Sequence, residues 1–221
     1  MKVLKFGGTS VANAQNILLV EKIVKKESSE NRVVVVVSAL SGVTDGLISA
    51  AESASAKNEN YSETIKTLEE KHLEFVKNLL PITEQSSWLS FVKKNFNDIE
   101  DICNGIYVLG EFTPRIKDKI TAYGEFLSSN IIAAKLKSDG LDCVWLDSRN
   151  YIKTNSNFTD AKVDFEKTNA NFQNYFKENK QQVTLAPGFI ASDVDGNITT
   201  LGRGGSDYTA SIIAAAVNAK E

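Results

Sequence analysis

Lys5-Phe6-Gly7-Gly8-Thr9-Ser10 separates a short apolar run, Met1 to Leu4, from a segment in which apolar residues recur at helical spacing, Val11 to Lys26. The pattern predicts a strand, a turn and a helix. The two glycines have no Cβ, so a ligand can approach their N–H groups closely. The lysine adds a positive charge, and the helix N-terminus adds unpaired N–H groups with a partial positive charge. The turn is therefore suited to the terminal phosphate of a nucleotide.

This turn is not a Walker A loop, in which a lysine follows the second glycine directly. Here Lys5 precedes both glycines. A turn of this composition also joins a strand to a helix where no ligand binds, and the lysine then only lays its alkyl chain along the surface. Both interpretations stay open at this point.

A second predicted strand, Arg32 to Ser38, contains five consecutive valines. Such a run is typical of a strand that is buried on both faces at the centre of a parallel sheet. Strand, helix and parallel strand form a βαβ unit, and ligands of such sheets bind beyond the carboxyl ends of the strands. We therefore expect the turn at 5–10 and the loop at 38–45, which is rich in small hydroxyl residues, to face one cleft.

The rest of the chain alternates between helical and strand patterns. Helices are predicted at about 45–56, over 57–109 with a break at Pro81, at 115–137, at 164–180 and from 207 onward, and strands at 143–146 and 183–186 and as a hairpin of 189–192 with 197–201. The helical region at about 57–116 contains no catalytic grouping. We expect it to be an insertion that serves as a lid or a packing surface, with a dimer face as an alternative.

Composition excludes several classes of protein. The chain has 221 residues, of which 28 are acidic and 25 basic, for a net charge of −3. This balance argues against nucleic acid as a partner. No apolar run reaches the ~18 residues of a membrane helix, and the N-terminus lacks the features of a signal peptide. We therefore expect a cytoplasmic protein that does not bind a membrane.

The cysteines and the histidine indicate no metal site. Cys103 and Cys143 lie in apolar stretches and are expected to be reduced core thiols. His72 is the only histidine, and with the two cysteines it forms no metal-ligand spacing. We expect His72 on a helix surface.

A second glycine-rich segment, Leu201 to Asp207, precedes the last predicted helix. Its spacing is not the dinucleotide fingerprint, because Asp207 stands where the last glycine would be. Arg203 offers a planar fork that matches a carboxylate, whereas Ser206 or Asp207 also suits a helix N-cap. Glu125 lies near the apolar face of a predicted helix, where it is either a surface residue or a ligand of a bound molecule.

Together these segments resemble the aspartate kinases of the amino-acid kinase family. The resemblance runs from end to end and rests on Lys5 to Val11, Ser38-Ala39 with Gly42 to Asp45, Gly124-Glu125, Gly188 to Ile190, and Leu201 to Tyr208. It implies an α/β fold: a three-layer αβα sandwich with a mostly parallel central sheet. The opening Met1 to Ala14 is most similar to the bifunctional branch, in which the kinase is fused to a homoserine dehydrogenase.

The family transfers a phosphoryl group from Mg-ATP to the β-carboxylate of L-aspartate. The product, 4-phospho-L-aspartate, opens the route to lysine, threonine and methionine. The resemblance implies that Lys5 and Asp207 are catalytic. It further implies a phosphate-binding turn of Lys5, Phe6, Gly7, Gly8, Thr9 and Ser10, and an aspartate subsite of Ser38, Ala39, Thr44, Glu125, Arg203, Gly204, Gly205 and Ser206.

The residue chemistry agrees with this implication. A carboxylate with a pKa of about 3.9 is ionised at pH 7, so the nucleophile needs no general base. It needs relief from the repulsion between two anions, and in-line positioning. Lys5, the glycine N–H groups and Mg²⁺ held mainly by the nucleotide would supply that relief, and Asp207 would orient Lys5. Arg203 would then bind the α-carboxylate of aspartate, and Glu125 its ammonium.

The chain departs from the family pattern in one respect. The family's nucleotide-binding segment, its regulatory domains and a fused dehydrogenase with its NAD(P) have no counterpart in the 221 residues. We therefore expect residues 1–221 to be the N-terminal part of one kinase domain, inactive alone, from a protein that is a homo-oligomer at full length. Two alternatives stay open: another amino-acid kinase with a different acidic substrate, and a non-catalytic aspartate-binding module.

Overall fold

A four-stranded parallel sheet forms the centre of the protein in the computed structural model, which describes residues 1–221. The strands follow the spatial order β1 (Lys2–Phe6), β2 (Val33–Val37), β5 (Val183–Pro187) and β3 (Cys143–Trp145). All three neighbouring pairs run parallel, and Val33 of β2 aligns with Lys2 on one side and with Val183 on the other. The predicted mostly parallel central sheet is confirmed.

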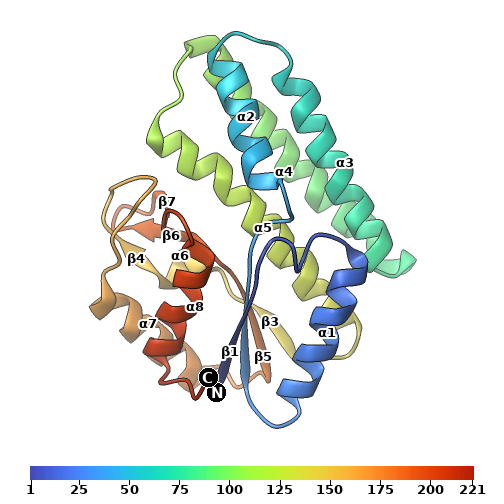
Figure 1. The fold of residues 1–221 in the computed structure, drawn as a ribbon, viewed down its shortest axis with the longest axis vertical. Coiled ribbons are helices and arrows are strands. Elements are labelled where there is room, and N and C mark those ends of the chain that lie inside the picture. The colour runs from blue at the N-terminus through green and yellow to red at the C-terminus, as the bar shows by residue number, and fades with distance from the viewer.

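The valines of β2 alternate between two hydrophobic cores. Val33, Val35 and Val37 pack into the larger core, whereas Val34 and Val36 pack into the smaller one. The larger core includes residues of α1 (Ala14–Ser28) and α5 (Pro114–Ser138), and the smaller core includes residues of α7 (Phe165–Glu178) and α8 (Gly205–Ala216). Helices therefore cover both faces of the sheet, which confirms the three-layer arrangement (Figure 1).

The helices α2 (Val43–Ser55), α3 (Tyr61–Leu79) and α4 (Ile82–Leu109) stand together beyond one end of the sheet (Figure 1). Their buried apolar residues belong to the larger of the two hydrophobic cores. The next helix, α5, begins after Thr113, whose Oγ1 accepts a hydrogen bond from Ile116 N–H at 3.3 Å, with Pro114 in the first turn. The predicted helical region at about 57–116 is thus confirmed, and its buried side packs into the main core.

The expectation that His72 lies on a helix surface was wrong. Its side chain is 0 % exposed, with Nδ1 2.8 Å from the Leu68 carbonyl oxygen and its ring 5.3 Å from the ring of Phe96. Nε2 has no hydrogen-bond partner. Because burial disfavours the charged imidazole, the pKa of His72 is lowered to about 4. His72 shares a helix face with Leu68 and Phe75, and this periodicity outweighs the polarity of its ring.

A second, three-stranded sheet holds β4 (Lys153–Thr154), β6 (Ile190–Asp193) and β7 (Ile198–Thr200). The predicted hairpin is confirmed: β6 and β7 pair antiparallel, and Gly196 takes a φ of 81° in the turn between them. Sequence analysis did not predict β4 or the short helix α6 (Ser148–Tyr151). Only Gly188 and Phe189 separate the carboxyl end of β5 from the start of β6. Because β7 runs antiparallel to β6, the segment after β7 returns to the carboxyl end of the main sheet.

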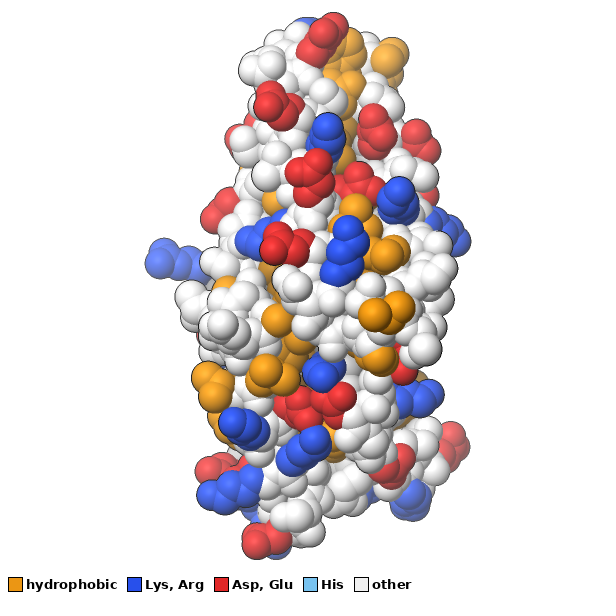
Figure 2. Space-filling view, turned by 90° about the vertical axis from the view of Figure 1, so that its right-hand side faces the viewer, with side chains coloured by type: hydrophobic (Ala, Val, Ile, Leu, Met, Phe, Trp, Pro, Cys, Tyr) orange, Lys and Arg blue, Asp and Glu red, His pale blue; other side chains and the backbone are white.

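The surface mixes charges of both signs. On the face drawn in Figure 2, basic and acidic side chains are interspersed and hydrophobic side chains appear in small groups.

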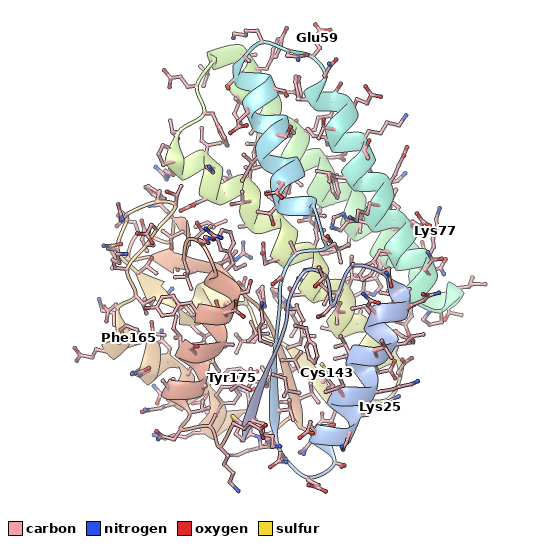
Figure 3. The ribbon with its side chains drawn as sticks, viewed as in Figure 1. Lys25, Glu59, Lys77, Cys143, Phe165 and Tyr175 are labelled. Carbon is pink, nitrogen blue, oxygen red and sulfur yellow. The ribbon has the colours of Figure 1, made fainter.

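In Figure 3, Tyr175 marks the buried side of α7 and Phe165 its exposed start, and Cys143 is half-buried. Cys103 is buried, and both thiols are unpaired. No helix combines the length and the hydropathy that crossing a membrane requires.

Candidate active site

The carboxyl ends of the central strands open on a cleft of about 300 Å³. Residues far apart in the sequence line it: Lys5 at the end of β1, Ser38 and Thr44 after β2, Glu125 on α5, and the segment 202–207. A second hollow of about 320 Å³ shares three of these residues and is further lined by Gly8, Thr9, Ala39, Leu40, Ser41, Gly42 and Asp45. The prediction that the turn at 5–10 and the loop at 38–45 face one cleft is therefore confirmed.

Lys5 and Asp207 form an ion pair in this cleft. Lys5 Nζ lies 2.8 Å from Asp207 Oδ1, and the two side chains are 26 % and 71 % exposed. An ion pair this accessible to water contributes at most about 1 kcal/mol to stability. Its significance is positional, because it ties the ammonium of β1 to the first turn of α8. A Cβ at Gly7 would lie 3.3 Å from Lys5 Nζ, so the glycine leaves room for the ammonium.

Two helices begin at the cleft with no side-chain cap. Gly42 precedes α2 and Gly204 precedes α8, with φ of 79° and 75° in the left-handed region that favours glycine. In each helix the second and third N–H groups donate to no acceptor in the chain. They belong to Thr44 and Asp45 of α2 and to Ser206 and Asp207 of α8. Free N–H groups and the positive ends of two helix dipoles favour an anion in the cleft.

The structure corrects one predicted helix start and excludes one N-cap that the sequence had left open. The first helix does not follow the glycine turn directly, because residues 7–12 form further turns, in which Ser10 N–H and Val11 N–H both donate to the Gly7 carbonyl. The N-terminus of α1 is capped instead by Asn13 Oδ1, which accepts from Asn16 N–H at 2.9 Å. The last helix begins at Gly205, so neither Ser206 nor Asp207 is its N-cap. The helix ends that face the cleft are those of α2 and α8.

Glu125 is a buried carboxylate at the floor of the cleft. Its side chain is 4 % exposed, and Oε2 has no hydrogen-bond partner. Burial raises the pKa of Glu125 to about 8, against the opposing effect of the Ala39 N–H group. The helix comes this close because position 124 is glycine: a Cβ there would lie 2.9 Å from Ala39 Cβ. An unpaired buried carboxylate is costly, and a cationic ligand would relieve the cost.

Arg203 is an exposed side chain that lines the cleft. It stands between Gly202 and Gly204, both at positive φ, and its guanidinium forms no ion pair or hydrogen bond within the chain. Ser206 lies close to it in sequence and packs so closely on the residue after β5 that a Cβ at Gly188 would lie 2.6 Å from Ser206 Cβ. The guanidinium therefore remains available to an anionic ligand.

The structure does not gather every predicted residue. Phe6 and Ser10 line a separate hollow of about 360 Å³ beside α1, and Gly7 lines none of the main hollows. Conversely, sequence reasoning included Phe189 in the family resemblance but not in the site, although it lines the cleft at a positive φ of 66° and donates its N–H to Thr209 Oγ1 at 2.9 Å. Its position directly after β5, beside Gly188, was the available signal. No three His, Cys, Asp or Glu side chains come together as a metal-binding group.

Comparisons with known proteins identify the family of the chain. Residues 1–221 match the sequence profile of the amino acid kinase family. The chain is 36 % identical over 216 residues to a chloroplastic bifunctional aspartokinase/homoserine dehydrogenase 1 of Arabidopsis thaliana, covering 96 % of this chain and 23 % of that protein. It is 31 % identical to lysine-sensitive aspartokinase 3 of Escherichia coli, covering 98 % of this chain and 46 % of that protein.

A solved structure is similar over the full length of the chain. Escherichia coli aspartokinase III in complex with aspartate and ADP superposes with a TM-score of 0.89 at 27 % identity, over 100 % of this chain and 48 % of that one. The chain thus spans about half the length of the single-function aspartokinases it matches and about a quarter of the bifunctional ones.

Proposed function

The chain belongs to the amino acid kinase family, and on that premise we propose that it is part of an aspartate kinase, which transfers the γ-phosphoryl group of ATP to the β-carboxylate of L-aspartate. One observation carries the proposal: an unpaired guanidinium, a buried carboxyl group with no cationic partner and an ammonium line the same cleft, on Arg203, Glu125 and Lys5. The names of the aspartokinase relatives support it.

The cleft complements aspartate group by group. The substrate carries two carboxylates and one ammonium. Arg203 binds the α-carboxylate as a planar fork, and Glu125 pairs with the ammonium, which relieves the cost of its burial. The hydroxyl groups of Ser38, Thr44 and Ser206 add hydrogen-bonding partners. With both ends of the amino-acid moiety held, the β-carboxylate is left to face the side of the cleft that carries Lys5.

The reaction needs charge neutralisation more than proton transfer. The attacking carboxylate is already ionised at pH 7, at a pKa of about 3.9. Lys5 and the free N–H groups at the starts of α2 and α8 fit a polyphosphate, because all of them favour negative charge. Mg²⁺, brought by the nucleotide, supplies further neutralisation of the phosphates when bound. Asp207 holds the Lys5 ammonium in place and takes no proton.

The direct test is substrate-dependent turnover. The protein expressed from the complete reading frame is mixed with Mg-ATP and with L-aspartate, L-glutamate or buffer, and ADP release is followed. We expect ADP only with aspartate, together with an acyl phosphate that hydroxylamine traps. Turnover with another acidic substrate would make it a different amino-acid kinase. Binding of aspartate in calorimetry, with no release of ADP in the turnover assay, would make it a binding module.

A cytoplasmic location and a homo-oligomeric whole protein remain predictions.

A further inference from the structure

Asp118 is a second buried carboxylate on α5, outside the cleft. Its side chain is 1 % exposed and has no cationic partner. Three donors satisfy it: Thr159 N–H at 2.9 Å and Thr200 N–H at 3.0 Å bind Oδ2, and Thr200 Oγ1 donates to Oδ1 at 2.6 Å. Hydrogen bonds to a charged acceptor are roughly twice as strong as neutral ones. The carboxylate thus joins one helix to two other segments of the chain.

Burying a charged group to join three segments carries a large desolvation cost. Burial raises the pKa of Asp118, and the hydrogen bonds from Thr200 and Thr159 only oppose that effect. Well-packed apolar side chains often stabilise a core equally well or better than buried charges do. A buried, fully bonded carboxylate instead fixes direction, because each of its donors must keep its place.

One donor, Thr200, lies immediately before the segment that lines the cleft. Thr200 ends β7, and Leu201, Gly202 and Arg203 follow it directly. Thr159 has a φ of 72°, an unfavourable conformation for a β-branched residue, and its hydrogen bond to Asp118 holds it there. The loop around Thr159 also bonds to β7, since Ala161 N–H donates to the Thr200 carbonyl at 3.0 Å.

The loop around Thr159 and Asp160 also packs closely against Gly202, next to Arg203. A Cβ at Gly202 would lie 3.0 Å from Asp160 Oδ1 and 3.3 Å from the Thr159 carbonyl oxygen. A displacement of the loop would therefore be transmitted to the turn that carries Arg203. Asp118 also stands about two turns before Glu125 on the same helix. One rigid helix consequently carries Glu125 and anchors the segment that carries Arg203.

We propose that Asp118 is a positioning residue, which sets the spacing between the two ends of the aspartate subsite by tying the Arg203 segment to the helix of Glu125. The inference rests on the proposed function for its ligand, and on the hydrogen bonds alone for its geometry. Neither Asp118 nor Thr200 lines the cleft. Their effect on aspartate is therefore indirect, whereas the phosphates of ATP also contact Lys5 and the start of α2, which form no hydrogen bond with Asp118 or Thr200.

The test compares Asp118→Asn with wild type. We expect KM for aspartate to rise about tenfold while KM for ATP changes less than twofold, because a misplacement of about 1 Å in a binding group can cost a factor of 10². Thr200→Val, which removes one donor, is expected to act in the same direction, and Thr200→Ser, which keeps the hydroxyl, is expected to match wild type. A purely structural role would lower the melting temperature and leave both KM values unchanged, which would overturn the proposal.

Amide hydrogen exchange separates this inference from the proposed function. We expect Asp118→Asn to speed exchange at Thr159, Thr200 and Arg203, with the α3 amides unchanged. If wild type does not act on aspartate, the proposed function fails, and unchanged exchange at those three amides would still refute the positioning role. If Asp118→Asn does not fold, the Thr200→Val and Thr200→Ser pair decides by the same two measurements.

Discussion

Lys5 Nζ and Asp207 Oδ1 lie 2.8 Å apart, although they come from opposite ends of the chain. The contact exists because α8 packs against β1 and begins at the carboxyl end of the sheet. It places an ammonium and a carboxylate side by side where two helix N-termini already favour negative charge. In the proposed reaction the Asp207 carboxylate holds the Lys5 ammonium toward the transferring phosphate and has no other role.

Lys5→Ala is expected to lower kcat by ~10²–10³, the usual loss when one electrostatic contact to a transition state is removed. Asp207→Asn should lower kcat as well, but should add little in the Lys5→Ala background, because both changes remove one unit. Steady-state kinetics of the three variants measures this. Lys2→Ala is the matched control, since Lys2 lies on the same strand and pairs with Glu27 and Glu221 away from the cleft. A fall in kcat of less than tenfold for Lys5→Ala would count against its role.

Arg203→Lys is expected to weaken aspartate binding by about tenfold or more and ATP binding by less than threefold. Lysine keeps the charge but loses the planar fork, and hydrogen bonds to charged groups are worth about 1.5–3 kcal/mol. Titration calorimetry with each ligand makes the comparison. Arg115→Lys serves as control, because Arg115 bonds to Asn197 outside the cleft. Equal losses for both ligands would remove Arg203 from the aspartate subsite.

Aspartate binding is expected to tighten as pH rises from 6 to 8. Burial raises the pKa of Glu125 to about 8, so at pH 7 the empty site is mostly protonated and must release a proton to pair with the ammonium. The affinity then grows by at most about tenfold per pH unit and levels off above the pKa. Calorimetry in two buffers of different ionisation enthalpy measures the proton released.

Glu125→Gln is expected to abolish this pH dependence and to weaken aspartate binding, because the amide keeps the shape and loses the charge. Glu63→Gln, an exposed change in the first turn of α3, should leave both unchanged. A wild-type protein that binds aspartate equally well at pH 6 and pH 8, with no proton released, would show that Glu125 is already ionised in the empty site or does not contact the ammonium.

His72 is expected to make the protein less stable in mild acid. Above pH 6.5 the ring is neutral in the folded and unfolded states, but between 6.5 and about 4 only the unfolded chain binds the proton. The unfolded state then gains protons that the folded state does not, so the free energy of unfolding falls by at most about 1.4 kcal/mol per pH unit. Urea unfolding of wild type and His72→Phe at pH 7, 6 and 5 isolates this contribution. The free energy of unfolding of wild type, relative to that of His72→Phe, should fall as the pH falls. An equal pH dependence of the two free energies would contradict the prediction.

The sequence by itself determined the main sheet and its open end. Five consecutive valines leave no polar position, so β2 had to be buried on both faces, and a βαβ unit then had to place the loops after β1 and β2 at one edge. The glycines at 7–8 and 204–205 marked the turns at that edge. Local chemistry of this kind is visible in a linear sequence because each signal involves neighbours along the chain.

Only the tertiary structure decided which groups meet and what environment each one has. The burial of His72 and Glu125 depends on helices packed against them from other parts of the chain, and burial is what shifts their pKa values. Asp118 carried no signal in the sequence, because its three hydrogen bonds come from Thr159 and Thr200, far along the chain. The free helix ends at the cleft were likewise settled by turn conformation, since Asn13 takes the cap of α1 while Gly42 and Gly204 offer no side chain to α2 and α8.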